Sequence, residues 1–324
     1  MQITVLSGGM GGSRFIQGVL AAVTPDDAVT VVANTADDIT VFGLRVCPDL
    51  DTVMYTLSGG IDPVRGWGRT DETWNAKAEL EAYGLAEAWF GLGDRDLATH
   101  LIRTEMLQEG ASLSDVTARL CERWKPGVRL LPMTDDTVET HIDTTIDGRP
   151  QRLHFQEFWI RHRAEVPVHG VEVVGADAAK AAPGVLAAIT DADVVLIPPS
   201  NPIVSVGPIV AIADIRAALR TTPAPVVGVS PIIGGSAVRG MANQLLGGLG
   251  VAVSAAGVAA FHGSRSEDGI LDGWLVDGSD AADVASIEQL GITTRAVPLW
   301  MSDPDTTKAL AADALQLADE LRRA

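Results

Sequence analysis

Four aspartates in the first fifth of the chain have the residue type and spacing of a metal site: Asp37, Asp38, Asp49 and Asp51. Carboxylate oxygens are ligands that Mg²⁺ prefers, and Mg²⁺ commonly joins one or two carboxylates to the phosphates of a substrate. Each aspartate also has a local alternative, because the first two could close a turn and either of the others could cap a helix. Since all four stand near a glycine-rich loop, we favour the metal site and predict all four as Mg²⁺ ligands.

The glycine-rich loop is Ser7-Gly8-Gly9-Met10-Gly11-Gly12, which follows an apolar run at residues 3–6 and precedes apolar residues at helical spacing. A strand, a glycine turn and a helix in this order place backbone N–H groups and a helix N-terminus against a phosphate. No lysine follows the glycines, so the loop is neither a Walker loop nor a clean dinucleotide fingerprint. We predict phosphate contacts from Gly8, Gly9, Gly11 and Gly12, with a bare tight turn as the alternative.

Two more loops follow strand-like apolar runs, at residues 198–208 and 230–235. Loops at the carboxyl edge of one parallel sheet converge in space, where ligands bind. We therefore expect both loops to line the crevice of the glycine loop and to contact a nucleotide. The residues predicted for this role are Ser200, Asn201, Pro202, Ser230 and Gly234.

An arginine between two acids, Asp94-Arg95-Asp96, stands beside glycines. One interpretation is an Arg95 held by the flanking acids and presented to a phosphate. The other is a solvated turn in which Asp96 caps the next helix. Arg14 and Arg239, at loop-to-helix junctions, are either phosphate partners or surface charges.

The elements that must position these residues alternate between strands and helices, which predicts an α/β, Rossmann-like three-layer fold with a mostly parallel sheet. Strand-like runs stop for about sixty residues, which predicts a mainly helical insertion at about 52–125 within a single domain spanning 1–324. Runs at 140–146 and 152–155 flank Asp147-Gly148, a signal for a β-hairpin.

Composition excludes several classes of function. The chain has 324 residues and a net charge of −18, so a broad electrostatic grip on nucleic acid or an anionic membrane is not expected. Two cysteines make neither a disulfide framework nor a zinc site, and no signal peptide or membrane-length apolar run is apparent. We expect a cytoplasmic protein that forms a homodimer. The sequence contains no Ser-His-Asp or Cys-His arrangement that favours covalent catalysis. The glycines, carboxylates and polar residues of the loops suit direct transfer at phosphorus.

Six motifs occur in one order along the chain: Gly8-Gly9-Met10-Gly11-Gly12, Asn34-Thr35-Ala36-Asp37-Asp38, Cys47-Pro48-Asp49-Leu50-Asp51-Thr52, Gly93-Asp94-Arg95-Asp96, Ser200-Asn201-Pro202-Ile203 and Ser230-Pro231-Ile232-Ile233-Gly234. Together they resemble the CofD/FbiA family, the transferases of coenzyme F420 biosynthesis. The resemblance covers essentially the whole chain and includes His154-Phe155-Gln156-Glu157-Phe158-Trp159 after the hairpin.

The resemblance implies a reaction. A hydroxyl of the deazaflavin Fo attacks a phosphoryl group of a guanosine-diphospho donor, which expels GMP and forms a phosphodiester. The donor carries 2-phospho-L-lactate in archaeal members and an enolpyruvyl group in actinobacterial ones. The stretch 59–77 looks closer to the actinobacterial branch, so we expect the enolpyruvyl donor.

The resemblance also implies where the ligands lie. It places Mg²⁺ and Fo near Asp37, Asp38, Asp49 and Asp51, and guanosine diphosphate at the glycine loop and the loops after 200 and 230. We accordingly predict Asp37, Asp51 and Arg95 as catalytic residues. Position 10 is Met where many relatives have a small or hydroxyl residue, so a cradle of backbone groups is expected there.

Two rival functions share the fold. A relative of the YvcK-type proteins would bind a nucleotide sugar and act in regulation. The motifs at 48–52 and 93–96 argue against this, because an Fo site needs them and a sugar-nucleotide sensor does not. An NAD-dependent oxidoreductase would need a different glycine spacing.

Overall fold

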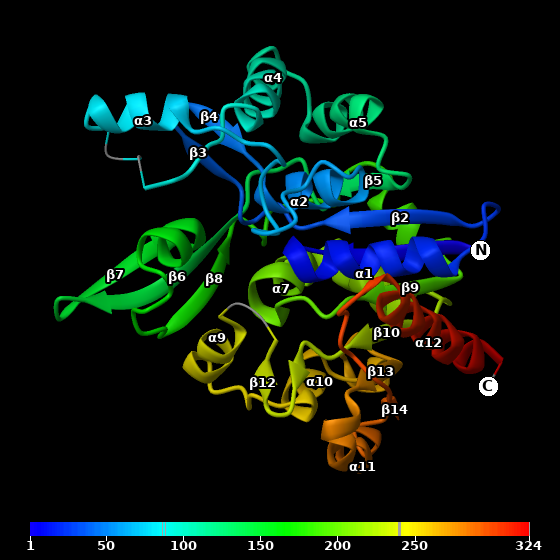
Figure 1. The fold of residues 1–324 in the computed structure, drawn as a ribbon. Helices are drawn as coiled ribbons and strands as arrows, with labels where there is room; N and C mark the ends of the chain where they lie inside the picture. Colours follow the sequence, from blue (N-terminus) through cyan, green and yellow to red (C-terminus); the bar gives the residue numbers. More distant parts are fainter. Residues whose placement is uncertain (86, 88, 239–240, 324) are drawn as a thin grey trace.

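The computed structural model describes residues 1–85, 87, 89–238 and 241–323, and Arg239 lies outside these residues. Its centre is a seven-stranded sheet in the order β14-β13-β10-β9-β1-β2-β5 (Figure 1). Every neighbouring pair in this sheet is parallel, as the apolar runs predicted. The strands are β1 (Gln2–Ser7), β2 (Ala28–Ala33), β5 (Arg129–Pro132), β9 (Val194–Ile197), β10 (Val226–Val229), β13 (Gly273–Val276) and β14 (Thr293–Ala296).

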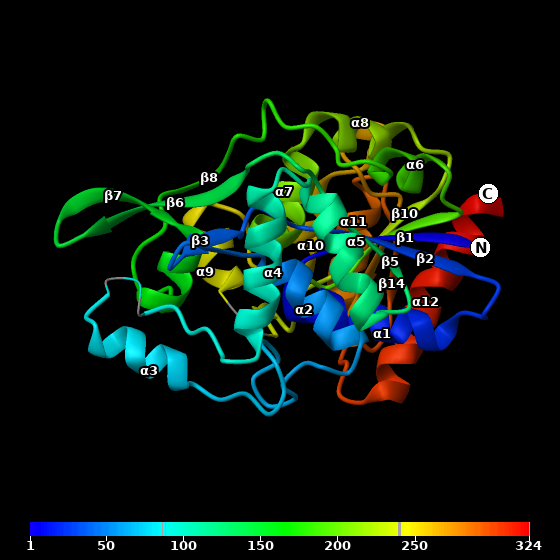
Figure 2. The ribbon, with the colours of Figure 1, turned by 90° about the horizontal axis from the view of Figure 1, so that it is seen from above.

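Helices cover both faces of this sheet, which makes the three layers that the sequence predicted. One apolar core joins the sheet to α1 (Gly9–Ala22), α2 (Pro48–Leu57), α5 (Leu113–Trp124) and α12 (Pro304–Arg323). The other face carries α6 (Val185–Thr190), α7 (Gly207–Ala211), α8 (Ala213–Thr221), α9 (Ala242–Gly248), α10 (Ala255–His262) and α11 (Val284–Glu288). Figure 2 shows α6 and α8 on one side of the sheet and α1 and α12 on the other. Successive strand residues point to opposite faces, so a strand buried on both sides is apolar throughout.

A second, antiparallel sheet has the order β7-β6-β8, with β6 (Glu139–Ile146), β7 (Arg149–His154) and β8 (Gly170–Val174). The predicted hairpin is confirmed. Its turn residues Asp147 and Gly148 have φ of 50° and 73°, the left-handed conformation that such a turn needs. The sheet projects from the body on the side opposite the two chain termini (Figures 1 and 2).

The predicted helices of the insertion are present as α3 (Asn75–Ala82), α4 (Asp96–Gln108) and α5. Sequence reasoning missed a small hairpin before them, made of β3 (Ile39–Val41) and β4 (Leu44–Val46). Strands of three residues are too short to show a period of two, and they are joined by Phe42 and Gly43 at positive φ.

Further short elements complete the chain: η1 (Glu157–Arg161), η2 (Pro202–Val206), η3 (Arg265–Glu267), η4 (Gly278–Asp283), β11 (Ile232–Ile233) and β12 (Ser236–Ala237). Within the described residues, no single helix has the length and apolarity to cross a membrane. One pair bent by 89°, Pro202–Ala211 with Ala213–Thr221, would satisfy these criteria by length and composition alone.

Candidate active site

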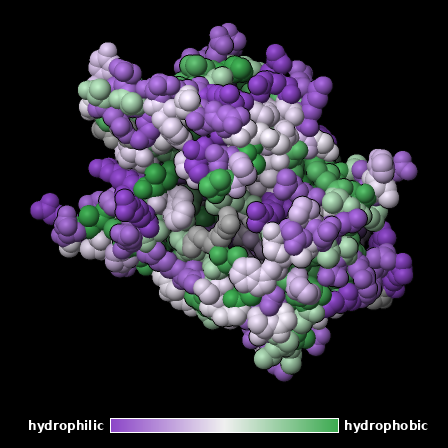
Figure 3. All heavy atoms as spheres, in the orientation of Figure 1, coloured by the Kyte–Doolittle hydropathy of each residue, from purple (hydrophilic) through white to green (hydrophobic). Residues whose placement is uncertain are grey.

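Three of the predicted loops meet at the carboxyl end of the parallel sheet, and Asn34 joins them. Its side-chain amide donates to Asp49 Oδ2 at 2.9 Å and to the Val204 carbonyl at 3.1 Å. Its oxygen accepts from Ala36 N at 2.9 Å, which shapes the loop after β2. The end of β2, the start of α2 and the loop after β9 therefore converge, as the sheet topology predicts. Seen in the orientation of Figure 1, the molecular surface is hollowed near its centre (Figure 3).

At Gly8 and Gly12 the glycine loop is packed so tightly that a side chain is excluded. A Cβ on Gly8 would lie 2.6 Å from Asp49 Oδ2 and 2.7 Å from Ser205 Cβ. A Cβ on Gly12 would overlap Ser7 Oγ and lie 2.9 Å from Ser200 Oγ. Helix α1 begins directly at Gly9, and its N-cap residue, Gly8, has no side chain that could cap it. The helix start thus offers backbone N–H groups to an anion.

Two of the four aspartates, Asp37 and Asp49, form one pair. Burial, and then the charge of Asp49, raise the pKa of Asp37 well above its ordinary value. Burial raises the pKa of Asp49 to about 6, against hydrogen bonds from Asn34 and the Gly9 amide that lower it. Asp37 Oδ1 is buried and finds no hydrogen-bond partner among the described residues. Two buried acids without a cationic partner among the described residues thus interact with each other, and Asp49 lies beside the start of α1.

Asp38 and Asp51 have a different environment, because each pairs with an arginine. Asp38 Oδ2 lies 3.3 Å from Arg45 Nη2, and burial raises its pKa to about 7 although the arginine opposes this. Asp51 Oδ1 pairs with the Arg103 guanidinium, and burial raises its pKa against the effect of that charge. The structure therefore divides the four predicted ligands into two unlike pairs.

The division bears on the fit of a magnesium ion. Among the side chains that the structure describes, no three of His, Cys, Asp or Glu are grouped so that they could hold a metal ion. Mg²⁺ is usually held by one or two carboxylates together with substrate phosphates. Asp37 and Asp49 fit that requirement, since they are close, lack a cationic partner in the structure as described, and leave an oxygen unbound.

The second sheet holds the acidic loop in place. Thr140 N donates to the Ala36 carbonyl at 2.7 Å, and Gln156 Nε2 donates to the Asp37 carbonyl at 3.2 Å. His154 Nε2 lies 3.2 Å from the Asp38 carbonyl oxygen. Because the backbone of the loop is bound from outside, its carboxylates have defined directions.

Arg95 differs from its expected arrangement. Its neighbours do not hold it: Asp94 accepts hydrogen bonds from Thr73, Asn75 and Ala76, and Asp96 accepts one from Tyr55. Asp96 is the first residue of α4 and not its cap. The Arg95 guanidinium is half exposed and lies 3.7 Å from Asp71. The expectation of flanking acids was wrong, while a phosphate contact stays a prediction.

The other residues that were predicted to contact the nucleotide follow the ends of strands, as expected. Some of their polar groups make hydrogen bonds within or between these loops. Asn201 Oδ1 accepts from Ile203 N and Val204 N, so it caps η2, which begins at Pro202. Ser200 Oγ donates to the Gly8 carbonyl at 3.1 Å. In the loop after β10, Ser230 Oγ donates to the Ile232 carbonyl, and Gly234 N donates to Asp280 Oδ2 at 2.9 Å.

Sequence reasoning gave Asn34 no role of its own, although it opens one of the six motifs, and it overlooked Arg103. The three buried residues of α4 are Thr99, His100 and Arg103, and all are polar. Polar residues at helical spacing usually mark a solvated face, so only their burial reveals a site. The sequence offered no local signal for this pair, because Asp51 lies in the first turn of α2 and its partner Arg103 is 52 residues further along the chain.

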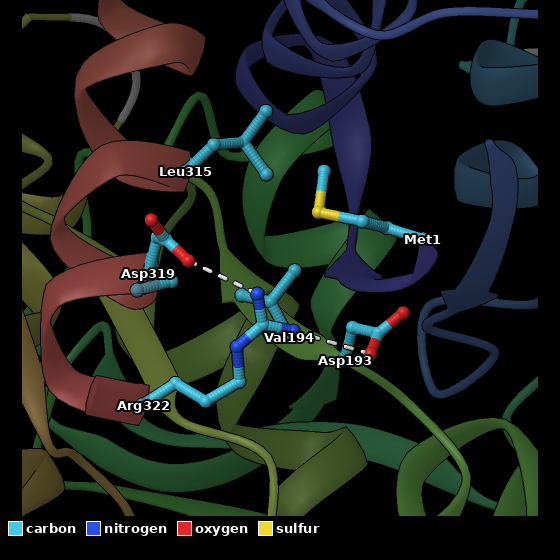
Figure 4. Close-up of a pocket in the computed structure, with 7 residues that line it drawn as sticks. Met1, Asp193, Val194, Leu315, Asp319 and Arg322 are labelled. Carbon is cyan, nitrogen blue, oxygen red and sulfur yellow. Dashed lines mark hydrogen bonds and ion pairs between the residues drawn. The ribbon is translucent and has the colours of Figure 1, made fainter.

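A small cavity lies at the opposite end of the sheet, near Met1 (Figure 4). Arg322 closes it through ion pairs with Asp193 at 3.3 Å and Asp319 at 3.0 Å. The amino ends of parallel strands carry no ligand loops in such sheets, so this cavity is not part of the site.

Comparison with known proteins now adds to this geometry. The family model described as 2-phospho-L-lactate transferase CofD matches residues 3–305 of the chain. The chain belongs to the CofD family. It is a transferase of a family that acts in coenzyme F420 biosynthesis, as the motif resemblance implied.

Curated relatives of this CofD-family chain are called phosphoenolpyruvate transferase. The protein of Streptomyces avermitilis is 58% identical over 99% of both chains, and that of Thermobifida fusca is 54% identical over 99% of both. The protein of Mycobacterium sp. (strain JLS) is 54% identical over 98% of this chain and 99% of its own. The expected actinobacterial branch is thereby confirmed.

Solved structures support the fold alone. A protein of the UPF0052 family from Bacillus halodurans superimposes with a TM-score of 0.60 at 18% identity, covering 97% of this chain and 99% of its own. A second structure of that protein gives a TM-score of 0.63 with the same identity and coverage.

Asp49 makes the stability of this CofD-family chain depend on pH. Folding raises its pKa from the ordinary 3.8 to about 6. A carboxyl that holds its proton more tightly when folded stabilises the fold at low pH, and this contribution is lost as pH rises through the folded pKa. The stability of the wild type relative to an Asp49→Asn variant should therefore fall as pH rises through this window, and should level off above it. Urea unfolding of both proteins across the window measures this difference, and a constant difference would contradict the assignment.

Proposed function

We propose that this chain transfers an enolpyruvyl-phospho unit from a guanosine-diphospho donor to a hydroxyl of the deazaflavin Fo. The hydroxyl oxygen forms a bond to the phosphorus that carries the three-carbon unit, and the bond from that phosphorus to the bridging oxygen breaks. GMP leaves with the bridging oxygen, and the hydroxyl proton passes to a carboxylate or to solvent. The product is the phosphodiester dehydro-coenzyme F420-0, or coenzyme F420-0 if the donor carries 2-phospho-L-lactate.

The observation that carries this proposal is the contact between Asp49 and the glycine-rich start of α1. Asp49 Oδ2 lies so close to Gly8 that no Cβ fits between them. Backbone N–H groups at a helix start bind phosphate oxygens, and carboxylates bind the metal that accompanies those phosphates. The two sets of groups meet where a diphosphate would need both.

Asp37 and Asp49 are the residues that would hold Mg²⁺. When bound, it would supply the positive charge that offsets the phosphates in a chain of net charge −18. Gly8, Gly9, Gly11 and Gly12 would orient the diphosphate through their amides.

The remaining ligands follow from the loops. The loops after β9 and β10, with Ser200, Asn201, Pro202, Ser230 and Gly234, would receive the guanosine portion. Arg95 is half exposed at the start of α4 and would approach a phosphate from the insertion.

The choice of the enolpyruvyl donor is supported by the names of relatives that share more than half of this sequence. Transfer at phosphorus depends on positioning and on neutralisation of charge. The choice between the two donors would therefore depend on the residues that contact the three-carbon unit more than on those at the reacting phosphorus. We also propose that the enzyme works as a homodimer in the cytoplasm, on these small molecules alone; light scattering of the purified protein tests the dimer.

Mass spectrometry of the product tests the proposed reaction. The protein is incubated with Fo and, separately, with the enolpyruvyl and the lactyl form of the guanosine-diphospho donor. We expect the faster product to be the unsaturated phosphodiester, lighter by two hydrogens than the lactyl product. Tight binding of a UDP-sugar without binding of Fo would support the regulatory alternative.

Removal of divalent cations should stop the reaction. The described crevice contains Asp37 and Asp49 without a cationic partner, so phosphates cannot approach these acids without added positive charge. With EDTA in excess, we expect product formation to fall at least about 100-fold, and added Mg²⁺ to restore it. Unchanged turnover after chelation would mean that protein groups neutralise the phosphates.

A further inference from the structure

Arg103 is a fully buried charge that no predicted motif contains. It is among the largest side chains with essentially no solvent exposure, at 1%. Its guanidinium pairs with Asp51 Oδ1, lies 3.2 Å from His100 Nδ1 and donates to the Arg45 carbonyl at 3.4 Å. A buried ion pair costs desolvation that its attraction often fails to repay, so stability alone is a weak reason for it.

The surroundings of this pair are polar on both helices. Tyr55, one turn after Asp51 on α2, donates its hydroxyl hydrogen to Asp96 Oδ1 at 2.6 Å and lies 2.8 Å from Thr99 Oγ1. His100 Nε2 lies 3.2 Å from Asp96 Oδ2 within α4 but makes no hydrogen bond among the described residues, so the link between the two helices is made by Tyr55 and Arg103. Hydrogen-bonded networks of this kind allow one register, whereas an apolar contact tolerates sliding. The insertion helix α4 therefore holds α2 in one position.

The consequence for Asp51 is that its two oxygens differ. Oδ1 is bound to Arg103, while Oδ2 is buried and finds no hydrogen-bond partner within the described chain. Apart from the Arg103 guanidinium on Oδ1, the described neighbour of this carboxylate is the His100 ring, whose Nδ1 lies 3.8 Å from Oδ2. An oxygen that is buried, unbound and fixed in direction is ready to accept a hydrogen bond from a ligand.

We propose that Arg103 is a positioning residue that withholds Asp51 from the metal and directs its free Oδ2 toward the hydroxyl of the acceptor. The acids then have separate roles. Asp37 and Asp49 bind the metal that accompanies the donor phosphates, and Asp51 accepts a hydrogen bond from the acceptor hydroxyl. The inference rests on the proposed function, because it presupposes an acceptor with a hydroxyl. It gives the helical insertion a role, since Arg103 of α4 orients one carboxylate of α2.

The test compares Arg103→Met, Arg103→Lys and the control Arg265→Met. Arg265 also pairs with an acid, Asp272, at 2.9 Å and donates to the Thr222 carbonyl at 2.8 Å, but it lies on the other face of the sheet from α2 and α4. Each variant is measured for thermal unfolding, for Mg²⁺ affinity by calorimetry, and for kcat and KM with Fo. Arg103→Lys keeps the charge but loses the planar fork that binds a carboxylate through two N–H groups.

We expect Arg103→Met to lower kcat/KM for the acceptor about 100-fold and to leave Mg²⁺ affinity within about threefold, since a correctly placed hydrogen-bonding group contributes about this much. Arg103→Lys should recover part of the loss. Arg265→Met should lower the melting temperature without a selective effect on the acceptor. If Arg103→Met does not fold, the same criteria apply to Arg103→Lys.

Two results would overturn the proposal: kcat/KM for the acceptor that falls no more than in Arg265→Met, or Mg²⁺ affinity that falls in parallel with it. Failure of the proposed function is a separate outcome. If the wild-type protein converts no Fo with either donor, the function is wrong. If it does and the Arg103 variants match the control, only the positioning role is wrong.

Discussion

An Asp37→Asn variant should lose about 10²–10³-fold in kcat while its fold is retained or becomes more stable. Asp37 is buried, its pKa is raised by burial and by Asp49, and its Oδ1 has no partner among the described residues. Asparagine has the same shape but no charge, so it relieves repulsion between the two acids and removes one ligand for the metal. Steady-state kinetics at saturating Mg²⁺ and a thermal melt measure the two effects.

The control for this prediction is Asp313→Asn. Burial also raises the pKa of Asp313, but this residue lies on α12, away from the carboxyl ends of the strands. Its kcat should match that of the wild type. Near-normal turnover of Asp37→Asn would contradict the metal assignment, and a loss of turnover in both variants would mean that the effect is not specific to the crevice.

A Gly8→Ala variant should lose both stability and activity. Its Cβ would lie 2.6 Å from Asp49 Oδ2 and 2.7 Å from Ser205 Cβ, so the α2 acid and the loop after β9 must move apart. Overpacking in such a place costs about 1–3 kcal/mol. Because a displacement of about 1 Å at a reacting centre costs about 100-fold in rate, we expect the loss of activity to exceed what the loss of folded protein explains.

Gly247→Ala provides the comparison. Gly247 lies in helix α9, and an added Cβ there would meet nothing within 4 Å among the described atoms. Alanine in a helix interior is favoured over glycine by up to about 1 kcal/mol, so this variant should be unchanged or slightly more stable. Denaturant unfolding and kcat, measured for Gly8→Ala and for Gly247→Ala, test this difference. Equal behaviour would mean that the glycine loop tolerates a side chain and that the cradle has been misplaced.

The sequence by itself predicted most helices and strands of this fold, and its ordered motifs indicated the family. Apolar runs such as that in β9 indicate strands buried on both faces, and Asp147-Gly148 indicates a hairpin turn; both depend only on neighbouring residues. The rule that parallel strands present their loops at one edge brought Gly8 and Ser200 together, as the structure confirms. Asp49 approaches Gly8 from the start of α2, which follows the short β3–β4 hairpin and not a strand of the parallel sheet.

The tertiary structure alone decided which charges compensate one another. The sequence showed four similar aspartates, but Asp38 and Asp51 acquire arginine partners 7 and 52 residues away, from β4 and α4, while Asp37 and Asp49 acquire none among the described residues. The strength of a charge interaction depends on distance and burial in the folded chain, and neither is encoded in a local pattern. For the same reason Arg103 resembled a surface residue of a helix until the packing of α4 against α2 buried it.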